Sequence, residues 1–333
     1  MAASITERLR VARSFSQAAE AADPRIRGLV AAAAAAALTE PEDGGAGQPS
    51  GINHDETPLQ LCFGLSAEGR KWRALYDPGV GAATPERRHA LALASLDALP
   101  SAFRRDAGTV LKWVGPTKTH PPASFPYGVF WLAAELPGQG HALYADVAAR
   151  AEPGQSGRMA IGCLAELAGT EGDILATIQG LSEIAAPASV GFERRREATR
   201  LKFHARLSCR PPGAALARLL PSLADRAVIG AVGALMQESG AIEAESVVLE
   251  AAFDGRTGRF VDAKIDLAMP RLCPPAQAFA RARSAARILN LAWPEALLSE
   301  MQSVARIAFV GIGRTQAGAG RMNLYLKPDT PLV

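Results

Sequence analysis

Hydrophobic and polar residues alternate strictly between Arg200 and Ser208. One face of this segment carries Arg200, Lys202, His204, Arg206 and Ser208, and the other carries Leu201, Phe203, Ala205 and Leu207. A period of two predicts a β-strand with one apolar and one polar face. Taken alone, such a strand is most simply an antiparallel strand whose charged face meets water.

The pattern recurs along the chain as five strand pairs, each joined by a turn. The pairs are 58–65 with 71–77, 127–136 with 141–148, 188–194 with 199–209, 246–253 with 259–269, and 306–314 with 321–327. Helical patterns lie between them, at 84–105, 158–168, 171–185, after Pro211-Pro212, and at 223–238, 275–291 and 294–304. Thr84 and Pro85 are typical of a helix N-terminus.

Strand pairs that alternate with helices allow two architectures: an open sheet with a helical layer, or a closed barrel with the helices outside. The closed barrel explains both strand faces. Its helices cover the apolar faces, and the polar faces point into a lumen that can hold ligands. We therefore expect an α/β (α+β) fold, a ten-stranded antiparallel β-barrel of five αββα repeats surrounded by helices. Residues 1–50 should form an N-terminal helical segment and loop, and residues 51–333 a single barrel domain.

Composition narrows the function classes. The 333 residues carry a formal net charge of +3, too small for a broad nucleic-acid-binding surface, although a local basic pocket for a small anion is compatible with it. No segment has the length and apolarity of a membrane span, and the early charges of Glu7 and Arg8 are unlike a signal peptide. The four cysteines match no zinc or redox spacing. We expect a cytoplasmic protein with buried free thiols and no membrane or nucleic-acid partner.

Two segments of the first strand pair resemble a known family. Asp55-Glu56-Thr57-Pro58-Leu59-Gln60 is similar to a "D-x-T-P-hydrophobic-Glu" strand, and Trp72-Arg73-Ala74-Leu75-Tyr76-Asp77-Pro78 to the "Arg…acidic-Pro" strand that follows it. Together with the five repeats over residues 55–328, they resemble the aromatic prenyltransferases of the ABBA (αββα) barrel, of the dimethylallyltryptophan synthase type. The resemblance implies transfer of a prenyl group from a prenyl diphosphate to an aromatic small molecule.

The resemblance also implies roles for individual residues. The side chains that fall on diphosphate-binding positions are Arg73, Arg200, Lys202, His204, Lys264, Arg314 and Tyr325. Gln60 falls where the family has an acid that contacts the acceptor ring. Tyr144 and Trp131 are candidates for shielding an allylic cation from water, although core packing is the commoner role of a strand tryptophan.

The sequence departs from the family pattern at three of these places. Gln60 replaces the acid, Ala142 stands where a lysine is expected two residues before Tyr144, and His204 replaces a tyrosine. His204 could equally be a hydrogen-bonded barrel residue without a catalytic role. No Asp-rich metal motif is present, so we expect the cationic side chains to take the place of Mg²⁺, and no cofactor to be required.

Two functions from different classes therefore remain. The first is an aromatic prenyltransferase that acts on an indole such as tryptophan, with a phenol or a peptide aromatic residue as other possible acceptors. The second is a non-catalytic barrel that binds a small anionic or aromatic ligand. Prenyl chain length, regiochemistry, the group that removes the ring proton and the oligomeric state do not follow from the sequence.

Overall fold

The computed structural model describes residues 5–26, 28, 32–33, 36, 48–53, 57–136, 140–149, 154–195, 198–207, 219–236, 246–315 and 317–329. Some features of the sequence fall outside these residues: Asp55 and Glu56 of the first motif, much of 27–47, the helix predicted after Pro212, and Cys209. The division at residue 50 into an N-terminal segment and a barrel domain stays a prediction.

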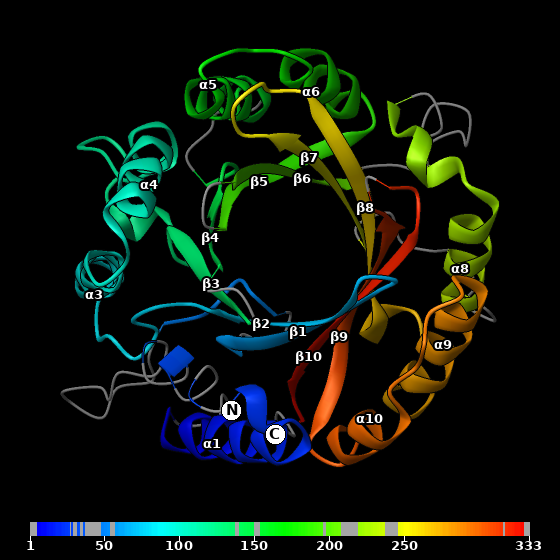
Figure 1. Cartoon of the computed structure of the whole chain (residues 1–333). Coiled ribbons are helices and arrows are strands. Elements are labelled where there is room, and N and C mark those ends of the chain that lie inside the picture. Colours follow the sequence, from blue (N-terminus) through cyan, green and yellow to red (C-terminus); the bar gives the residue numbers. More distant parts are fainter. Residues whose placement is uncertain are drawn as a thin grey trace.

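Ten strands form one closed antiparallel barrel (Figure 1). Neighbours in the sequence are neighbours in the barrel, and β1 closes the ring against β10. The strands are β1 (Leu59–Ser66), β2 (Gly69–Tyr76), β3 (Phe130–Leu136), β4 (Gly140–Asp146), β5 (Ala185–Arg195), β6 (Ala198–Leu207), β7 (Val247–Asp254), β8 (Phe260–Ala268), β9 (Ala305–Arg314) and β10 (Gly320–Pro328). The predicted ten-stranded barrel is confirmed.

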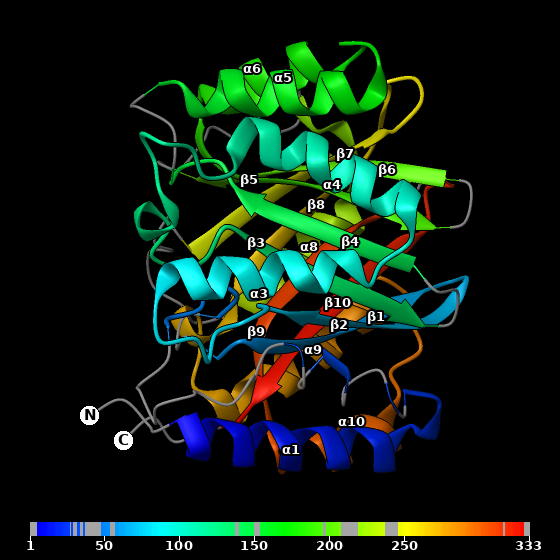
Figure 2. The same cartoon turned by 90° about the vertical axis from the view of Figure 1, so that its left-hand side faces the viewer.

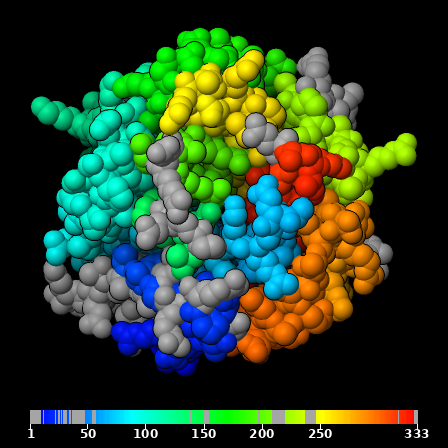
Figure 3. Space-filling model, in the orientation of Figure 1, coloured from blue at the N-terminus to red at the C-terminus, as the bar shows by residue number. Residues whose placement is uncertain are grey.

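The strand boundaries agree with the predicted pairs to within a few residues. The second pair starts later than expected, at Phe130, because a turn from Phe125 to Gly128 precedes it, with Gly128 at a φ of 90°. Since the strands alternate in direction around the ring, all five hairpin turns lie at one end of the barrel (Figure 2). Figure 3 views that end, where the light-blue atoms of the β1–β2 hairpin lie near the centre of the molecule.

Helices surround the barrel (Figure 1). In the described residues they are α1 (Ile5–Ala22), α3 (Pro85–Asp97), α4 (Ser101–Val114), α5 (Ser156–Ala168), α6 (Ile174–Ser182), α8 (Arg226–Met236), α9 (Pro275–Ile288) and α10 (Glu295–Met301). None of these helices combines the length and apolarity that a membrane crossing needs. The single helix predicted over 84–105 is two, because Pro100 disfavours helical backbone at the residue before it and starts α4.

The hydrophobic core lies between the helices and the outer face of the barrel. Leu61, Phe63 and Phe203 point outward and are fully buried. The ring of Phe103 on α4 packs against Phe192 on β5, with centroids 4.7 Å apart. Each such side chain contributes roughly 1.5–3 kcal/mol of burial free energy. The apolar strand faces therefore point toward the helices, and the polar faces point into the lumen.

Glycines make room for long side chains inside the barrel. A Cβ at Gly311 on β9 would lie 2.9 Å from Lys264 Cδ, and one at Gly191 on β5 would lie 2.7 Å from Tyr144 Cδ1. Both distances are shorter than van der Waals contact allows. The two glycines thus let Lys264 and Tyr144 lie across their neighbouring strands.

Candidate active site

A layer of paired charges crosses the lumen. Its members come from seven strands and face inward, as the alternation along each strand requires. We call this set the ionic layer: Arg73, Glu135, Glu193, Arg195, Arg200, Lys202, His204, Glu250, Asp262, Lys264, Asp266 and Arg321.

The first part of the layer surrounds Arg73 on β2. Its Nη2 lies 2.9 Å from Glu135 Oε2, and its Nη1 forms an ion pair with Glu193. Nη1 also donates to the Tyr144 hydroxyl at 3.0 Å, and that hydroxyl donates to Glu193 Oε1 at 3.2 Å. Arg195 adds a second guanidinium, 2.7 Å from Glu135 Oε2. Tyr144 is therefore held in place by a hydrogen bond on each side.

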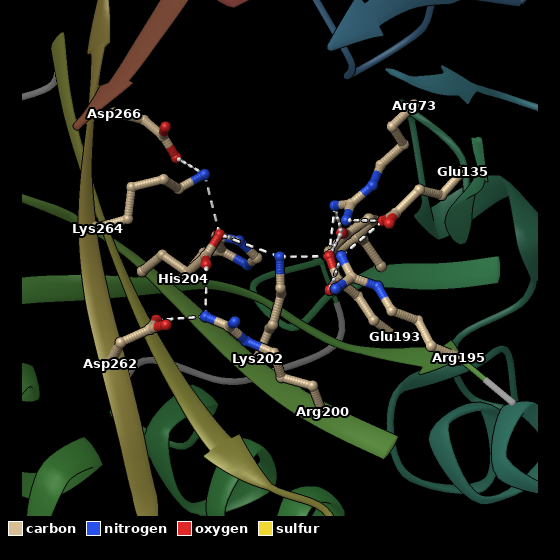
Figure 4. A network of polar contacts seen from close by, with 12 residues as sticks. Arg73, Glu135, Glu193, Arg195, Arg200, Lys202, His204, Asp262, Lys264 and Asp266 are labelled. Atoms are coloured by element: carbon tan, nitrogen blue, oxygen red, sulfur yellow. Dashed lines mark hydrogen bonds and ion pairs between the residues drawn. The ribbon is translucent and has the colours of Figure 1, made fainter. Parts of the chain in front are cut away.

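Lys202 occupies the middle of the layer (Figure 4). Its Nζ lies 2.6 Å from Glu193 Oε1 and 3.4 Å from Glu250 Oε2. The side chain comes from the alternating segment on β6 and is 7% exposed. Lys202 thus joins the carboxylate of β5 to the carboxylate of β7.

Lys264 on β8 has two carboxylates for partners. Its Nζ lies 3.0 Å from Glu250 Oε2 and 2.9 Å from Asp266 Oδ2. It also donates to the Tyr325 hydroxyl and lies 4.9 Å from the centroid of that ring. Tyr325 is therefore in direct contact with a buried ammonium group.

Arg200 and Arg321 share one carboxylate on the remaining side. Both guanidinium groups pair with Asp262 Oδ1, Arg321 at 2.8 Å. They also approach Glu250 Oε1 at 4.0 and 3.8 Å. Glu250 is consequently the most surrounded acid of the layer.

His204 is hydrogen-bonded on both ring nitrogens. Nε2 lies 3.2 Å from Glu250 Oε2, and Nδ1 lies 3.1 Å from the Ser189 hydroxyl. Because an ionised carboxylate can only accept, a neutral His204 carries its proton on Nε2 and accepts from Ser189 at Nδ1. The ring also packs edge-on against Tyr144, with centroids 5.6 Å apart.

The central carboxylates are ionised. Burial by itself would raise the pKa of Glu193, but Arg73 and Lys202 outweigh burial and hold that pKa well below its ordinary value. The same balance, with Lys202 and Lys264 as the partners, holds the pKa of Glu250 well below its ordinary value. Burial raises the pKa of Tyr144, so its phenol stays neutral.

Two chambers meet at the ionic layer. The larger is a cavity of about 620 Å³ with an aromatic and aliphatic wall that includes Tyr127, Trp131, Tyr144, Phe309 and Tyr325. The smaller is a cavity of about 230 Å³ at the hairpin-turn end, with Lys71, Arg195, Arg200, Lys202 and Arg321 among its lining residues. Arg73 and Glu250 line both chambers. A ligand in the lumen thus meets an apolar wall on one side and charges on the other.

Gln60 on β1 lines the larger chamber in a fixed orientation. Asn53 Nδ2 donates to the backbone oxygens of Thr57 and Leu59, at 2.7 and 3.2 Å. The Asn53 Oδ1 atom therefore has to accept, and it does so from Gln60 Nε2 at 3.0 Å. This arrangement leaves Gln60 Oε1 as the atom that can accept a hydrogen bond from a ligand. A glutamate here would set a carboxylate against Asn53 Oδ1, so glutamine fits this barrel where the family's acid would not.

Most of the residues singled out in the sequence converge in the lumen. Arg73, Arg200, Lys202, His204 and Lys264 belong to the ionic layer. The side chains that line the larger chamber beside it are Gln60, Trp131, Tyr144 and Tyr325. His204 is on the aromatic side: it lines the larger chamber, whereas Arg200 and Lys202 line the smaller one.

Arg314 lies apart from this group. On β9 the residues that face the lumen are Phe309, Gly311 and Gly313, so the next residue points outward. The Arg314 guanidinium pairs there with Asp225, just before α8, at 2.5 Å. The guanidinium that the last hairpin supplies to the layer is Arg321, on β10.

Sequence reasoning also missed the carboxylates of the layer. Their signal is present in the hairpins, where opposite charges stand directly across from each other: Glu193 from Arg200, and Glu250 from Lys264. Such cross-strand pairs stabilise a sheet. The predicted buried thiols are confirmed for Cys62, Cys163 and Cys273. Burial raises the pKa of Cys62 to about 11, so this lumen thiol is not a nucleophile at neutral pH.

Comparison with known proteins identifies the fold. No protein-family model matches the sequence, and no curated protein is detectably similar to it. Solved structures do match. The prenyltransferase PriB, in its ternary complex with L-tryptophan and dimethylallyl thiolodiphosphate, has a TM-score of 0.74 at 14% identity, over 98% of this chain and 96% of PriB. The chain has the ABBA prenyltransferase-barrel fold.

Two further ABBA structures are similar over nearly their whole length. The 5-dimethylallyl tryptophan synthase of Streptomyces coelicolor, in complex with DMASPP and Trp, matches with a TM-score of 0.73 at 17% identity, covering 100% of this chain and 99% of its own. The 6-dimethylallyltryptophan synthase of Micromonospora olivasterospora, also with DMASPP and Trp, matches with a TM-score of 0.70 at 15% identity, covering 98% and 97%. The fold expected from the resemblance is confirmed.

Proposed function

We propose that this protein is an aromatic prenyltransferase that transfers a prenyl group from a prenyl diphosphate to an electron-rich aromatic ring, with an indole as the acceptor. One observation carries the proposal: a buried cluster of cationic side chains directly adjoins an aromatic-walled chamber inside a closed barrel. The first suits a diphosphate, and the second suits a prenyl chain and a flat ring. Three ABBA structures of similar shape are described as complexes with tryptophan and a thiolodiphosphate or DMASPP, which supports the same pair of ligands here.

Loss of diphosphate is the first chemical demand. The C–O bond to the prenyl group breaks, and negative charge develops on the departing oxygens. The smaller chamber is lined by Arg73, Arg200 and Lys202, whose positive charges would stabilise this negative charge. Preorganised cations in a site that excludes water are effective at this task. The dimethylallyl or longer allylic cation is left on the side of the larger chamber.

The cation must then be kept from water until the ring attacks it. Tyr144 and Tyr325 face the larger chamber next to the ionic layer, and their faces can stabilise a passing carbocation. Both phenols are hydrogen-bonded to layer residues and remain neutral. Trp131 extends this wall on β3.

Gln60 and His204 line the larger chamber, where one orients the acceptor ring and the other receives its proton. Gln60 Oε1 accepts a hydrogen bond from the acceptor's ring N–H and so orients the indole. After attack, the C–H bond at the substituted carbon breaks and its electron pair restores the aromatic ring. The proton passes to the Ser189 hydroxyl, which gives its own proton to His204 Nδ1; Glu250 stabilises the resulting imidazolium.

Mass spectrometry tests the proposal directly. The purified chain is incubated with dimethylallyl, geranyl and farnesyl diphosphate and with tryptophan, a phenol and an aromatic-containing peptide, each with and without EDTA. We expect a prenylated indole and released diphosphate, and activity that persists in EDTA because the cationic side chains stabilise the leaving group. Loss of activity in EDTA that Mg²⁺ restores would overturn the metal-independent form of the proposal.

The acceptor arms separate the alternatives. Product with the phenol or peptide and none with tryptophan would replace the indole by that acceptor. Binding of a diphosphate or an indole without product in any arm would favour a non-catalytic barrel.

A further inference from the structure

The cations proposed to bind diphosphate already have anionic partners inside the barrel. Glu193 contacts Arg73 and Lys202, and Glu250 contacts Lys202 and Lys264. These carboxylates come from β5 and β7, the two neighbours of β6, which supplies Arg200 and Lys202. In the protein without ligand, Glu193 and Glu250 therefore occupy positions that the oxygens of a bound diphosphate would otherwise take.

The charge balance of the ionic layer is close to neutral. Within the described residues it holds five carboxylates and six Lys and Arg side chains. Apart from His204, and with all of these groups ionised, one positive charge is in excess. A diphosphate ester carries more negative charge than this excess, so it cannot bind simply by filling an empty cationic pocket.

The two central acids have almost no contact with solvent. Glu250 has a side chain that is 2% exposed, and Glu193 has one that is 5% exposed. Glu250 lines both chambers, so it stands at the boundary that a prenyl diphosphate must span. Any phosphate oxygen that approaches Lys202 or Lys264 meets this carboxylate at close range.

We propose that Glu193 and Glu250 are internal counter-anions that compete with diphosphate for the cations of the lumen and so set its affinity. The inference rests on the proposed function, because it assumes that the diphosphate binds at this layer. Binding exchanges carboxylate–cation pairs for phosphate–cation pairs, and release of the product diphosphate reverses the exchange. The carboxylates preserve the cation cluster between turnovers and keep it from retaining the product.

The inference predicts that loss of a buried acid strengthens ligand binding, which is the opposite of the usual effect of changing a site residue. Inorganic diphosphate is titrated into the full chain by calorimetry, at one fixed ionic strength because exposed charges are screened by salt. The variants are Glu250→Gln, Glu193→Gln and the control Glu300→Gln. Glu300 lies exposed on α10, so the control removes the same charge without touching the lumen.

We expect Glu250→Gln to bind diphosphate at least tenfold more tightly than the unmodified chain, and Glu300→Gln to bind as the unmodified chain does. In turnover assays, Glu250→Gln should show stronger inhibition by diphosphate. Circular dichroism establishes that each variant is folded, and Glu193→Gln carries the same test if Glu250→Gln is not.

Equal or weaker binding by a folded Glu250→Gln or Glu193→Gln, with prenyl transfer intact in the unmodified chain, would overturn the counter-anion role and leave the proposed function standing. A tenfold gain in Glu300→Gln would also overturn it, because net charge alone would then explain the effect. Absence of diphosphate binding in the unmodified chain and in every lumen variant would overturn the proposed function itself.

Discussion

The two chambers of the lumen differ in what they offer a ligand. The larger chamber has an aromatic wall with the amide oxygen of Gln60 oriented toward it, and its lining also includes Asp146, Arg206 and Asp266. The smaller chamber draws charged side chains from seven strands, β2, β3, β5, β6, β7, β8 and β10. They are represented by Lys71, Glu135, Arg195, Arg200, Glu250, Asp262 and Arg321. For the proposed reaction, the barrel therefore places an aromatic wall for the prenyl group next to a charged surface for the diphosphate.

The difference follows from the alternation of the strands. Every strand directs every second residue inward, so the choice of residue at successive inward positions sets the chemistry at each depth of the lumen. On β6 these positions run Arg200, Lys202, His204, Arg206; the first two line the smaller chamber and the last two line the larger one. The substitutions that follow each alter one of the two chambers or the ionic layer between them.

The largest effect is expected from Lys202→Met, which removes the ammonium at the centre of the ionic layer. Prenyl transfer should fall by roughly 10²–10³-fold, the usual cost of one preorganised charge contact in a transition state. Binding of tryptophan, measured by calorimetry, should change little. Undiminished turnover in a folded Lys202→Met protein would show that the diphosphate does not contact the layer.

Lys202 also compensates two buried acids, so the variant needs a stability control. Removing one partner of a buried pair typically costs about 3–5 kcal/mol. If Lys202→Met does not fold, Arg200→Gln tests the same chamber, because Arg200 is 25% exposed and its loss leaves Arg321 beside Asp262.

A second prediction uses pH to probe the layer. The pKa values of Glu193 and Glu250 are held below the ordinary value of 4.5, so the unfolded chain binds protons in acid before the folded chain does. The stability that these groups contribute is therefore present above about pH 4.5 and is lost as the pH falls through their folded pKa values. Melting temperatures measured from pH 7 to 3 should fall steeply in acid, and less steeply for Glu250→Gln. Identical acid slopes would contradict the prediction.

On the aromatic side, Gln60→Ala should raise the KM for the indole acceptor by about tenfold, the effect of losing one hydrogen bond of 1–1.5 kcal/mol. The KM for prenyl diphosphate should stay the same. Gln60→Glu should also lower activity, because its carboxylate meets Asn53 Oδ1. Steady-state kinetics for both substrates check the two variants, and unchanged acceptor kinetics in Gln60→Ala would mean that this amide does not touch the ring.

The smallest effects are expected on diphosphate binding, from substitutions of the two arginines of the last hairpin, Arg321 and Arg314. Arg321→Gln should weaken binding of inorganic diphosphate several-fold, since this guanidinium belongs to the ionic layer. Arg314→Gln should leave diphosphate binding within about twofold and cost less than about 1 kcal/mol of stability, because its pair with Asp225 is part-exposed. Calorimetry and thermal unfolding measure both. A larger loss of binding in Arg314→Gln would mean that Arg314 does contact the diphosphate.

The fold could be predicted because five strand pairs with distinct turns alternate with helical segments, and their second strands set polar side chains against an apolar face. The apolar face of 200–208 indicated a covering layer, and the number of helices supplied it. Gln60 and Arg73 were assigned to the site through the family resemblance, and the charged face of β6 through alternation as well. What alternation could not supply was the register of β9, where a run without charged residues before Arg314 gives no sign of which face points inward.

The carboxylates were missed because the alternation that predicts a polar inward face is clearest on the second strand of each hairpin. Glu193 and Glu250 lie on first strands, and their effect on the cations depends on a ring closure that brings together strands distant in sequence. Likewise, the partner of Gln60 is Asn53, in the segment before the first strand, where no periodicity marks its position.

A structure of the protein with tryptophan and a non-hydrolysable thiolo analogue of dimethylallyl diphosphate tests the central claim most directly. The account predicts phosphate oxygens within hydrogen-bond distance of Arg200 and Lys202, the prenyl chain between Tyr144 and Tyr325, and the indole N–H on Gln60 Oε1. A diphosphate bound outside the barrel, or ligands in the lumen with phosphate groups on the aromatic side and the ring on the charged side, would contradict it.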